Sequence, residues 1–183
     1  MAKIDKSKMN SGEKGILKNT KKENLGSLCI ENPKLSPYFK VGLQAIKNEN
    51  RDKIKFPNTR KIDGSIDFDE ALKNDYPDAN RWDYGIEYDS NLIFIEVHPA
   101  QTSEVDNIIK KAQFIKEWLK NNCSKILNLP KFERGDRQFY WVASGGNGIL
   151  ATSRQAKRLA INHIKPVGTI FDYTKMNTTP QKW

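Results

Sequence analysis

Residues 81–100 read RWDYGIEYDSNLIFIEVHPA and predict two β-strands joined by a tight polar turn. In the first strand Asp83 and Glu87 alternate with aromatic and aliphatic residues, and in the second Glu96 and His98 share one face. The sequence Asp-Ser-Asn between them fits a hairpin turn. This stretch therefore carries the grouping of ionisable side chains on which a functional hypothesis can be built.

The length of the hairpin loop decides whether these side chains meet. Directly opposed residues of an antiparallel pair point to the same face, so Asp83 joins Glu96 and His98 only if the loop has an even number of residues. A loop of residues 90–91 would place Asp83 opposite His98, whereas a loop of residues 89–90 would place it opposite Glu96. A three-residue loop would put Asp83 on the other side of the sheet and remove the site.

Two carboxylates on adjoining strands repel each other unless a cation or a proton lies between them. Oxygen ligands of this kind suit Mg²⁺ or Mn²⁺, and an ion held by Asp83 and Glu96 would keep positions for water and a phosphate oxygen. That arrangement supports metal-assisted hydrolysis of a phosphodiester. The alternative is that these acids are solvated residues of an exposed sheet face. Glu96, however, lies inside the apolar run LIFIEVH, where a carboxylate needs a partner.

Composition narrows the class of protein. The chain has 183 residues, enough for one domain, and its net charge of +9 arises from 31 basic and 22 acidic residues. This balance fits a polyanionic partner such as nucleic acid, although lysine-rich proteins without that function share it. Two cysteines and two histidines argue against a transition-metal centre.

No membrane partner is expected. No apolar run approaches the roughly 20 residues that span a bilayer. The polar N-terminus also lacks the apolar core of a signal peptide. We therefore expect a cytoplasmic protein.

The chain divides into a tail and a domain. Residues 1–30 are rich in lysine, serine and asparagine, with almost nothing to bury, and predict a basic, flexible tail. Such a tail could sweep over a phosphate backbone or simply be solvated. Residues 31–183 are expected to form a single domain.

Within the domain the predicted order of elements is αβββαβαβ. Ser36 and Pro37 indicate the start of the first helix, and Gly64 indicates an irregularity in the first strand. The first strand and the hairpin should form a three-stranded meander, and the second helix should cover the sheet face that carries Glu96. The remaining expected elements are strands over 61–71, 137–144 and 166–173, a loop over 72–80, and helices over 103–121 and from about 152.

Several basic residues are candidate contacts for nucleic-acid phosphates. The sequence SGGNGIL joins the strand over 137–144 to the next helix, and it fits either a plain turn or a weak phosphate-binding loop, since it lacks the ending of a P-loop. For each basic residue the alternative is an ordinary solvated side chain. The candidates are Lys110 and Lys111 on the helix over 103–121, and Arg154, Lys157 and Arg158 on the helix that starts near residue 152.

The order of elements, an Asp in the second strand and a Glu-x-basic triplet in the third together resemble the PD-(D/E)XK nuclease superfamily. The resemblance spans roughly residues 35–173 and implies a restriction-endonuclease-like α/β fold, a central mixed sheet flanked by helices. It also implies that Asp83 and Glu96 are ligands of a catalytic metal and that Val97 fills the variable position. His98 stands where the superfamily has lysine, and here the chain departs from the pattern.

The resemblance therefore implies a Mg²⁺- or Mn²⁺-dependent endonuclease that hydrolyses DNA phosphodiester bonds, with Asp83, Glu96 and His98 as catalytic residues. Histidine can accept a proton or donate a hydrogen bond near neutral pH. Lys110 or Lys111 would supply the missing positive charge, as relocated lysines do in some members. Members are frequently two-fold dimers, so a homodimer is also allowed. The alternative is a module that keeps the nuclease fold without catalysis and binds nucleic acid or protein.

Overall fold

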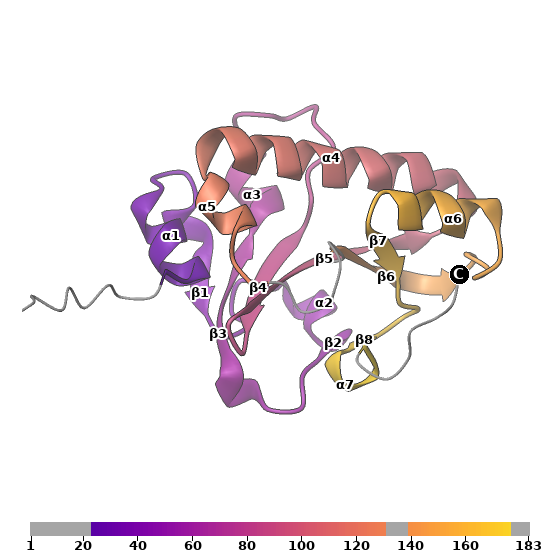
Figure 1. Cartoon of the computed structure of the whole chain (residues 1–183), viewed down its shortest axis with the longest axis horizontal. Helices are drawn as coiled ribbons and strands as arrows, with labels where there is room; N and C mark the ends of the chain where they lie inside the picture. The colour runs from indigo at the N-terminus through magenta and orange to yellow at the C-terminus, as the bar shows by residue number, and fades with distance from the viewer. Residues whose placement is uncertain (1–22, 131–138, 177–183) are drawn as a thin grey trace, which may run out of the picture.

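The computed structural model describes residues 23–130 and 139–176, and its centre is a mixed sheet of six strands. The strands lie in the order β1-β3-β4-β5-β6-β7 (Figure 1). Their bounds are β1 Phe39–Val41, β3 Ile62–Asp67, β4 Tyr84–Tyr88, β5 Asn91–Ala100, β6 Phe139–Asn147 and β7 Ile164–Pro166.

The sheet has an antiparallel half and a parallel half. Strands β1, β3, β4 and β5 pair antiparallel in that order, and β5, β6 and β7 pair parallel. In the hairpin Tyr88 lies opposite Asn91, so the loop is Asp89 and Ser90. Both loop residues have positive φ, 50° and 64°, as expected for a two-residue turn that follows the strand twist. Because this loop has an even number of residues, the acidic residues of both strands lie on one face of the sheet.

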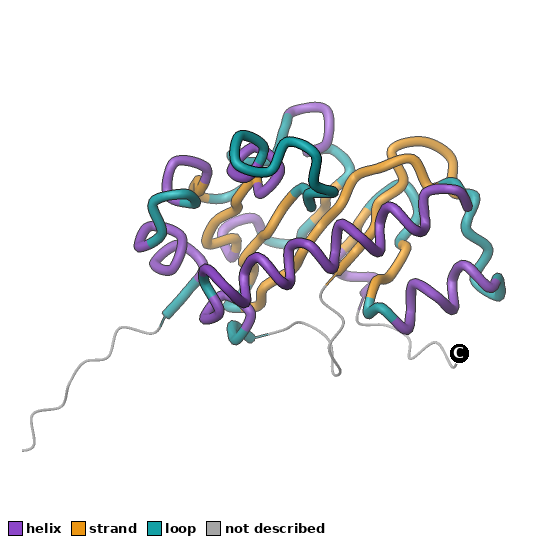
Figure 2. The backbone as a smooth tube through the Cα atoms, turned by 90° about the horizontal axis from the view of Figure 1, so that it is seen from above, coloured by secondary structure: helices purple, strands orange, loops and turns teal. Residues whose placement is uncertain are grey.

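Helices cover one face of the sheet (Figures 1 and 2). The long helix α4 crosses this face, and its buried residues pack with Leu92 and Phe94 of β5 and with Phe139 of β6. The same core includes residues from α1, α3, α5 and α6. Helix bounds on this face are α1 Leu25–Glu31, α3 Phe68–Leu72, α4 Val105–Asn122, α5 Ser124–Leu127 and α6 Arg154–Ile161.

The opposite face is covered by shorter elements. Tyr84, Ile86 and Ile93 of the large sheet pack there with Ile54 and Phe171, which belong to a two-stranded parallel sheet. The elements on this side are α2 Asn48–Arg51, β2 Ile54–Lys55, β8 Phe171–Asp172 and α7 Tyr173–Met176. Three 3₁₀ turns, Ser36–Tyr38, Thr59–Lys61 and Thr102–Glu104, join elements of the described chain.

The expected α/β architecture with a mixed central sheet is confirmed, as are the meander β3-β4-β5 and the long covering helix. The irregularity expected at Gly64 is also present, because the β3–β4 register shifts between Ile62 and Gly64. A Cβ atom at Gly64 would lie 2.2 Å from Phe39 Cζ. The missing side chain therefore lets the Phe39 ring of β1 lie over β3.

That contact explains why the predicted helix from Ser36 is wrong. Ser36 begins only a 3₁₀ turn that ends at Tyr38, and Phe39 of β1 then pairs with Ile66 of β3. Pairing with the sheet overrides the helix-start signal. The predicted strand over 166–173 is also wrong in its extent. Gly168, with φ +76°, separates β7 from β8, and β8 belongs to the second sheet.

Two boundaries also differ. The domain was expected to begin at residue 31, but Leu25, Leu28 and Cys29 of α1 are buried in the core, and Asn24 caps that helix. A proline usually ends a strand, because it has no amide hydrogen for the ladder, yet β5 continues through Pro99 to Ala100. The β5–β6 register shifts between His98 and Ala100, and such an irregularity tolerates a residue without an amide hydrogen.

The rest of the predicted tail, residues 1–22, lies outside the described residues. Across the parts of the chain that are described, no helix is both long and apolar enough to cross a membrane.

The hairpin loop provides a test of the register. Ser90 holds φ at 64°, a region that costs an L-residue about 1 kcal/mol and glycine almost nothing. We expect Ser90→Gly to raise the free energy of unfolding by up to about 1 kcal/mol and Ser90→Val to lower it by a similar amount. Urea denaturation measures both, and a destabilised Ser90→Gly protein would contradict this loop.

Candidate functional site

The hairpin register brings the two predicted carboxylates together. Tyr84 lies opposite Ile95, and one further step along the pair places Asp83 opposite Glu96. Of the two even-loop registers that the sequence left open, the loop at residues 89–90 is the one adopted.

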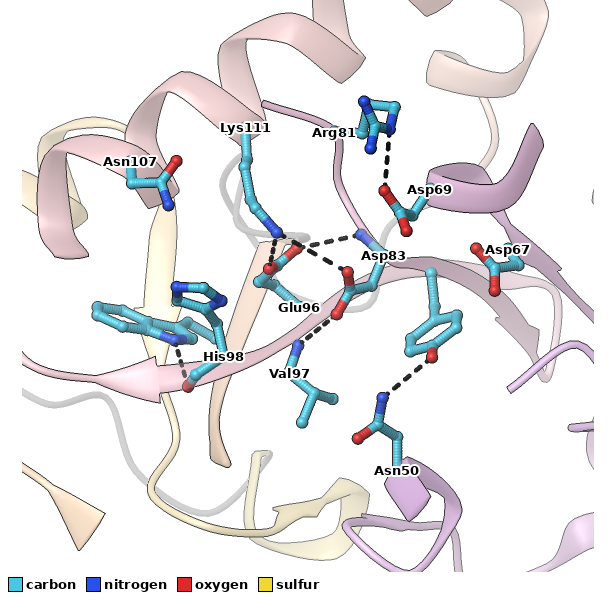
Figure 3. Close-up of polar contacts among 12 residues, drawn as sticks. Asn50, Asp67, Asp69, Arg81, Asp83, Glu96, Val97, His98, Asn107 and Lys111 are labelled. Atoms are coloured by element: carbon cyan, nitrogen blue, oxygen red, sulfur yellow. Dashed lines mark hydrogen bonds and ion pairs between the residues drawn. The ribbon is translucent and has the colours of Figure 1, made fainter. Parts of the chain in front are cut away.

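Backbone amides fix both carboxylates (Figure 3). The Val97 N–H donates to Asp83 Oδ2 at 2.9 Å, and the Asp83 N–H donates to Glu96 Oε2 at 3.1 Å. Because strand β4 begins at Tyr84, these side chains accept amide hydrogens just beyond the regular pairing of the two strands. Each carboxylate is therefore anchored by the strand that carries the other.

Lys111 of α4 lies against the carboxylate pair. Its Nζ donates to Glu96 Oε1 and is 3.8 Å from Asp83 Oδ1. The side chains are largely buried, with exposed fractions of 15% for Lys111, 18% for Asp83 and 0% for Glu96. Lys110, the neighbouring residue, is exposed. Of the two lysines proposed from the sequence, Lys111 is the one that the helix directs to the acids.

Burial sets the protonation of this group. Burial, and then the nearby Asp83 charge, raise the pKa of Glu96 to about 8 in spite of Lys111. Burial also raises the pKa of Asp83, against the opposing effect of Lys111. Burial lowers the pKa of Lys111, but Glu96 and Asp83 outweigh it and leave that pKa above its ordinary value. The protonation of each group depends on the other two. One charged lysine faces two acids, each of which holds its proton more tightly than an exposed carboxyl group does.

His98 is oriented by the start of α4. Its Nε2 lies 2.9 Å from Glu104 Oε2, and Asn107 Nδ2 donates to the same oxygen at 3.2 Å. The indole of Trp141 donates to the His98 carbonyl at 3.1 Å. Glu104 was not identified from the sequence, because its position depends on how the chain turns between β5 and α4. An acid six residues after the histidine was the available signal.

A second group of acids lies beside the pair, and sequence reasoning missed it. Asp67 caps α3 by accepting from the Glu70 amide at 2.8 Å, and burial raises its pKa to about 6. Asp69 accepts from Arg81 Nε at 2.9 Å and is 3.8 Å from Lys47 Nζ. These acids add to the negative potential at Asp83, and the half-buried Arg81 and the exposed Lys47 offset it.

The other predicted phosphate contacts lie on the surface. Arg154, Lys157 and Arg158 are exposed on α6, and Arg158 pairs with Asp106 in the first turn of α4. This contact places the basic helix next to the N-terminal end of α4, which Glu104 directly precedes. Lys111, by contrast, points inward to the acids, so its expected role as a surface phosphate contact is not what its geometry supports.

The donor set suits one class of metal. In residues 23–130 and 139–176 no three His, Cys, Asp or Glu side chains are arranged to hold an ion. Zinc sites with three or four such ligands are therefore not supported here. Mg²⁺ commonly uses one or two carboxylates and takes its other ligands from water and substrate phosphate. Asp83 and Glu96 fit that pattern, with Lys111 as the competing cation.

We compared the chain with protein-family models, with curated proteins and with solved structures, and found no match in any of the three.

Removing Lys111 should show how much the buried acids destabilise the folded protein when no cation contacts them. Lys111→Met takes away the cation that contacts Glu96 and should lower the free energy of unfolding by about 3 kcal/mol, whereas Lys110→Met should change it little. A second change, Glu96→Gln in the Lys111→Met protein, should restore part of the loss because the fully buried acid that Lys111 contacted is then neutral. Urea denaturation of the three variants measures this, and equal effects at positions 110 and 111 would refute the pairing.

Stability should also depend on pH in a defined direction. Folded Glu96 keeps its proton up to about pH 8, but the unfolded chain releases it near 4.5. The folded state thus binds more protons in this window, so the free energy of unfolding falls as pH rises, by at most about 1.4 kcal/mol per unit for one group. Asp67 acts in the same direction up to about pH 6. Between about pH 6 and 8 Glu96→Gln should flatten the dependence, and an unchanged slope would rule out a raised Glu96 pKa.

Proposed function

We propose that this protein is a divalent-metal-dependent endonuclease that hydrolyses DNA phosphodiester bonds. The observation that carries the proposal is the convergence of Asp83 and Glu96 from adjoining strands, fixed by amides of the same two strands and faced by Lys111. Two buried acids and a buried lysine are costly for stability alone, because burial disfavours each charge. Groups of this kind are typical of functional sites.

The arrangement of elements supports the proposal. An antiparallel meander β3-β4-β5 is followed by the covering helix α4 and by β6, which pairs parallel with β5. This is the βββαβ part of the element order on which the resemblance to the PD-(D/E)XK superfamily rests, and β1 stands where that order has its first helix. Asp83 directly precedes the second meander strand and Glu96 lies within the third, which agrees with the metal-ligand positions that the resemblance implies.

Each residue then has a proposed role. Asp83 and Glu96 bind Mg²⁺ or Mn²⁺, which would polarise a phosphoryl oxygen and lower the pKa of bound water. Lys111 supplies positive charge near the negative charge that develops on the phosphate. His98, oriented by Glu104, positions or activates the attacking water. Lysine is thus provided by α4 while histidine occupies the usual place of lysine on the strand.

Substrate binding would use the basic surface. The net charge of +9 favours a polyanion. The exposed Arg154, Lys157 and Arg158 of α6 adjoin the start of α4, and exposed Lys110 lies beside Lys111. These side chains would contact phosphates without reading sequence.

A specific observation favours a second candidate, a module that binds nucleic acid without cleaving it. Lys111 already contacts both acids, so the group is compensated without a metal ion. Such a module would bind DNA in a salt-sensitive manner and would be indifferent to magnesium. Calorimetric titration with Mg²⁺ separates the candidates, because the nuclease predicts saturable binding that Glu96→Gln removes.

Cleavage assays test the first candidate. We expect the protein to cut plasmid or linear DNA with Mg²⁺ or Mn²⁺ and to lose about a hundredfold or more in rate on Asp83→Asn or Glu96→Gln, because each change removes a metal ligand. Glu49→Gln is the matched control, since that glutamate is exposed on α2. If the protein cleaves neither single-stranded, duplex nor modified DNA with either ion, the nuclease proposal is wrong.

A further inference from the structure

A small pocket lies against the C-terminal half of α4. Its volume is about 200 Å³, smaller than the roughly 300–1,000 Å³ of drug-sized sites. Its size suits a single planar ring system. The lining residues are Tyr76 from the loop after α3, and Phe114, Glu117, Trp118, Asn121 and Asn122 from α4.

The pocket is connected to the acidic site along α4 and through Arg81. Phe114 and Trp118 follow Lys111 by three and seven residues, so they lie on the same side of the helix at a rise of about 4.5 and 10 Å. Arg81, two residues before Asp83, donates to the carbonyl of Tyr76 at 2.6 Å. A nucleotide next to one bound at the acids could therefore reach the pocket.

The lining has both stacking and hydrogen-bonding groups. The rings of Tyr76 and Phe114 meet edge to face, with centroids 5.5 Å apart. Trp118 is 4% exposed, and its Nε1 is buried with no hydrogen-bond partner among the described residues. Since that N–H has no accessible surface, the indole acts as an apolar wall, and the polar side chains that line the pocket are Glu117, Asn121 and Asn122.

These groups discriminate between ligand classes. Aromatic rings beside Glu117 could in principle attract an ammonium group. An ammonium, however, has no acceptor for the amide hydrogens of Asn121. A nucleobase has an acceptor for the Asn121 amide, a donor for Glu117, and a face that stacks on an aromatic ring.

We propose that this pocket binds the base of an unstacked nucleotide adjacent to the phosphate held at Asp83 and Glu96. The inference rests on the proposed nuclease function and specifies its substrate class. The preferred substrate is single-stranded DNA, or a duplex with an extruded base, rather than an intact duplex. Base binding at Phe114 and Trp118 would then select the strand that is cut.

Nucleosides test the pocket independently of cleavage, because they carry no phosphate. In ¹H–¹⁵N spectra the indole signal of Trp118, assigned with Trp118→Phe, should shift saturably on addition of a deoxynucleoside, while those of Trp82 and Trp141 stay in place. Phe114→Leu, which keeps apolar bulk and removes the ring, should abolish the shift. No saturable shift with any of the common deoxynucleosides, or an equal shift in Phe114→Leu, would overturn the proposal.

Oligonucleotide binding without metal tests the substrate class. Phe114→Leu should weaken binding of single-stranded DNA by about 5- to 150-fold, the equivalent of roughly 1–3 kcal/mol for one stacked base, and leave duplex binding unchanged. Equal weakening on both substrates would contradict base binding. The two proposals fail separately. Nucleoside binding without DNA cleavage would support the base-binding pocket and contradict the nuclease function, whereas cleavage without nucleoside binding would support the nuclease function and contradict the pocket.

Discussion

The reciprocal bonds between two acidic side chains and two backbone amides are the constraint on which the candidate site depends. Glu96 accepts from the Asp83 amide, and Asp83 accepts from the Val97 amide, just beyond the paired part of β4 and β5. If the carboxylates separated, two partly buried amides would lose their acceptors, which costs free energy. Their proximity is thus enforced by the hairpin, and their mutual repulsion must be relieved by a cation or a proton.

Helix α4 supplies that cation and also closes the site. Its apolar side packs on the sheet, and the same packing directs Lys111 to the acids while Glu104, next to the helix start, holds His98. The apolar packing of α4 on the sheet therefore positions the charged end of Lys111, as expected when a long side chain extends from a well-packed helix. The structural and the functional explanations of this group are compatible. The lysine stabilises the acids at rest, and a divalent ion at the acids would leave its charge available to a phosphate.

Much of this arrangement follows from local patterns. The alternation in residues 81–100 predicted the hairpin, the apolar run around Glu96 predicted a paired carboxylate, and helical spacing predicted α4. A lysine at the acids, Lys110 or Lys111, was suggested only by the resemblance. Local patterns could not choose between two even loops, because the choice depends on positive φ at Asp89 and Ser90. They also missed Glu104, Asp69 and Arg81, which approach the site only through tertiary contacts. The helix expected from Ser36 failed for a similar reason, since Phe39 pairs with β3 over Gly64.

The central claim is that Asp83 and Glu96 hold a divalent ion in competition with Lys111. Titration with Mn²⁺, followed by paramagnetic broadening of backbone amide signals, tests it most directly because broadening reports where the ion lies. The account predicts saturable broadening centred on Asp83, Val97 and Lys111, reversed by excess Mg²⁺ and abolished by Glu96→Gln. Broadening that does not saturate, or that centres on other acids and survives Glu96→Gln, would contradict it.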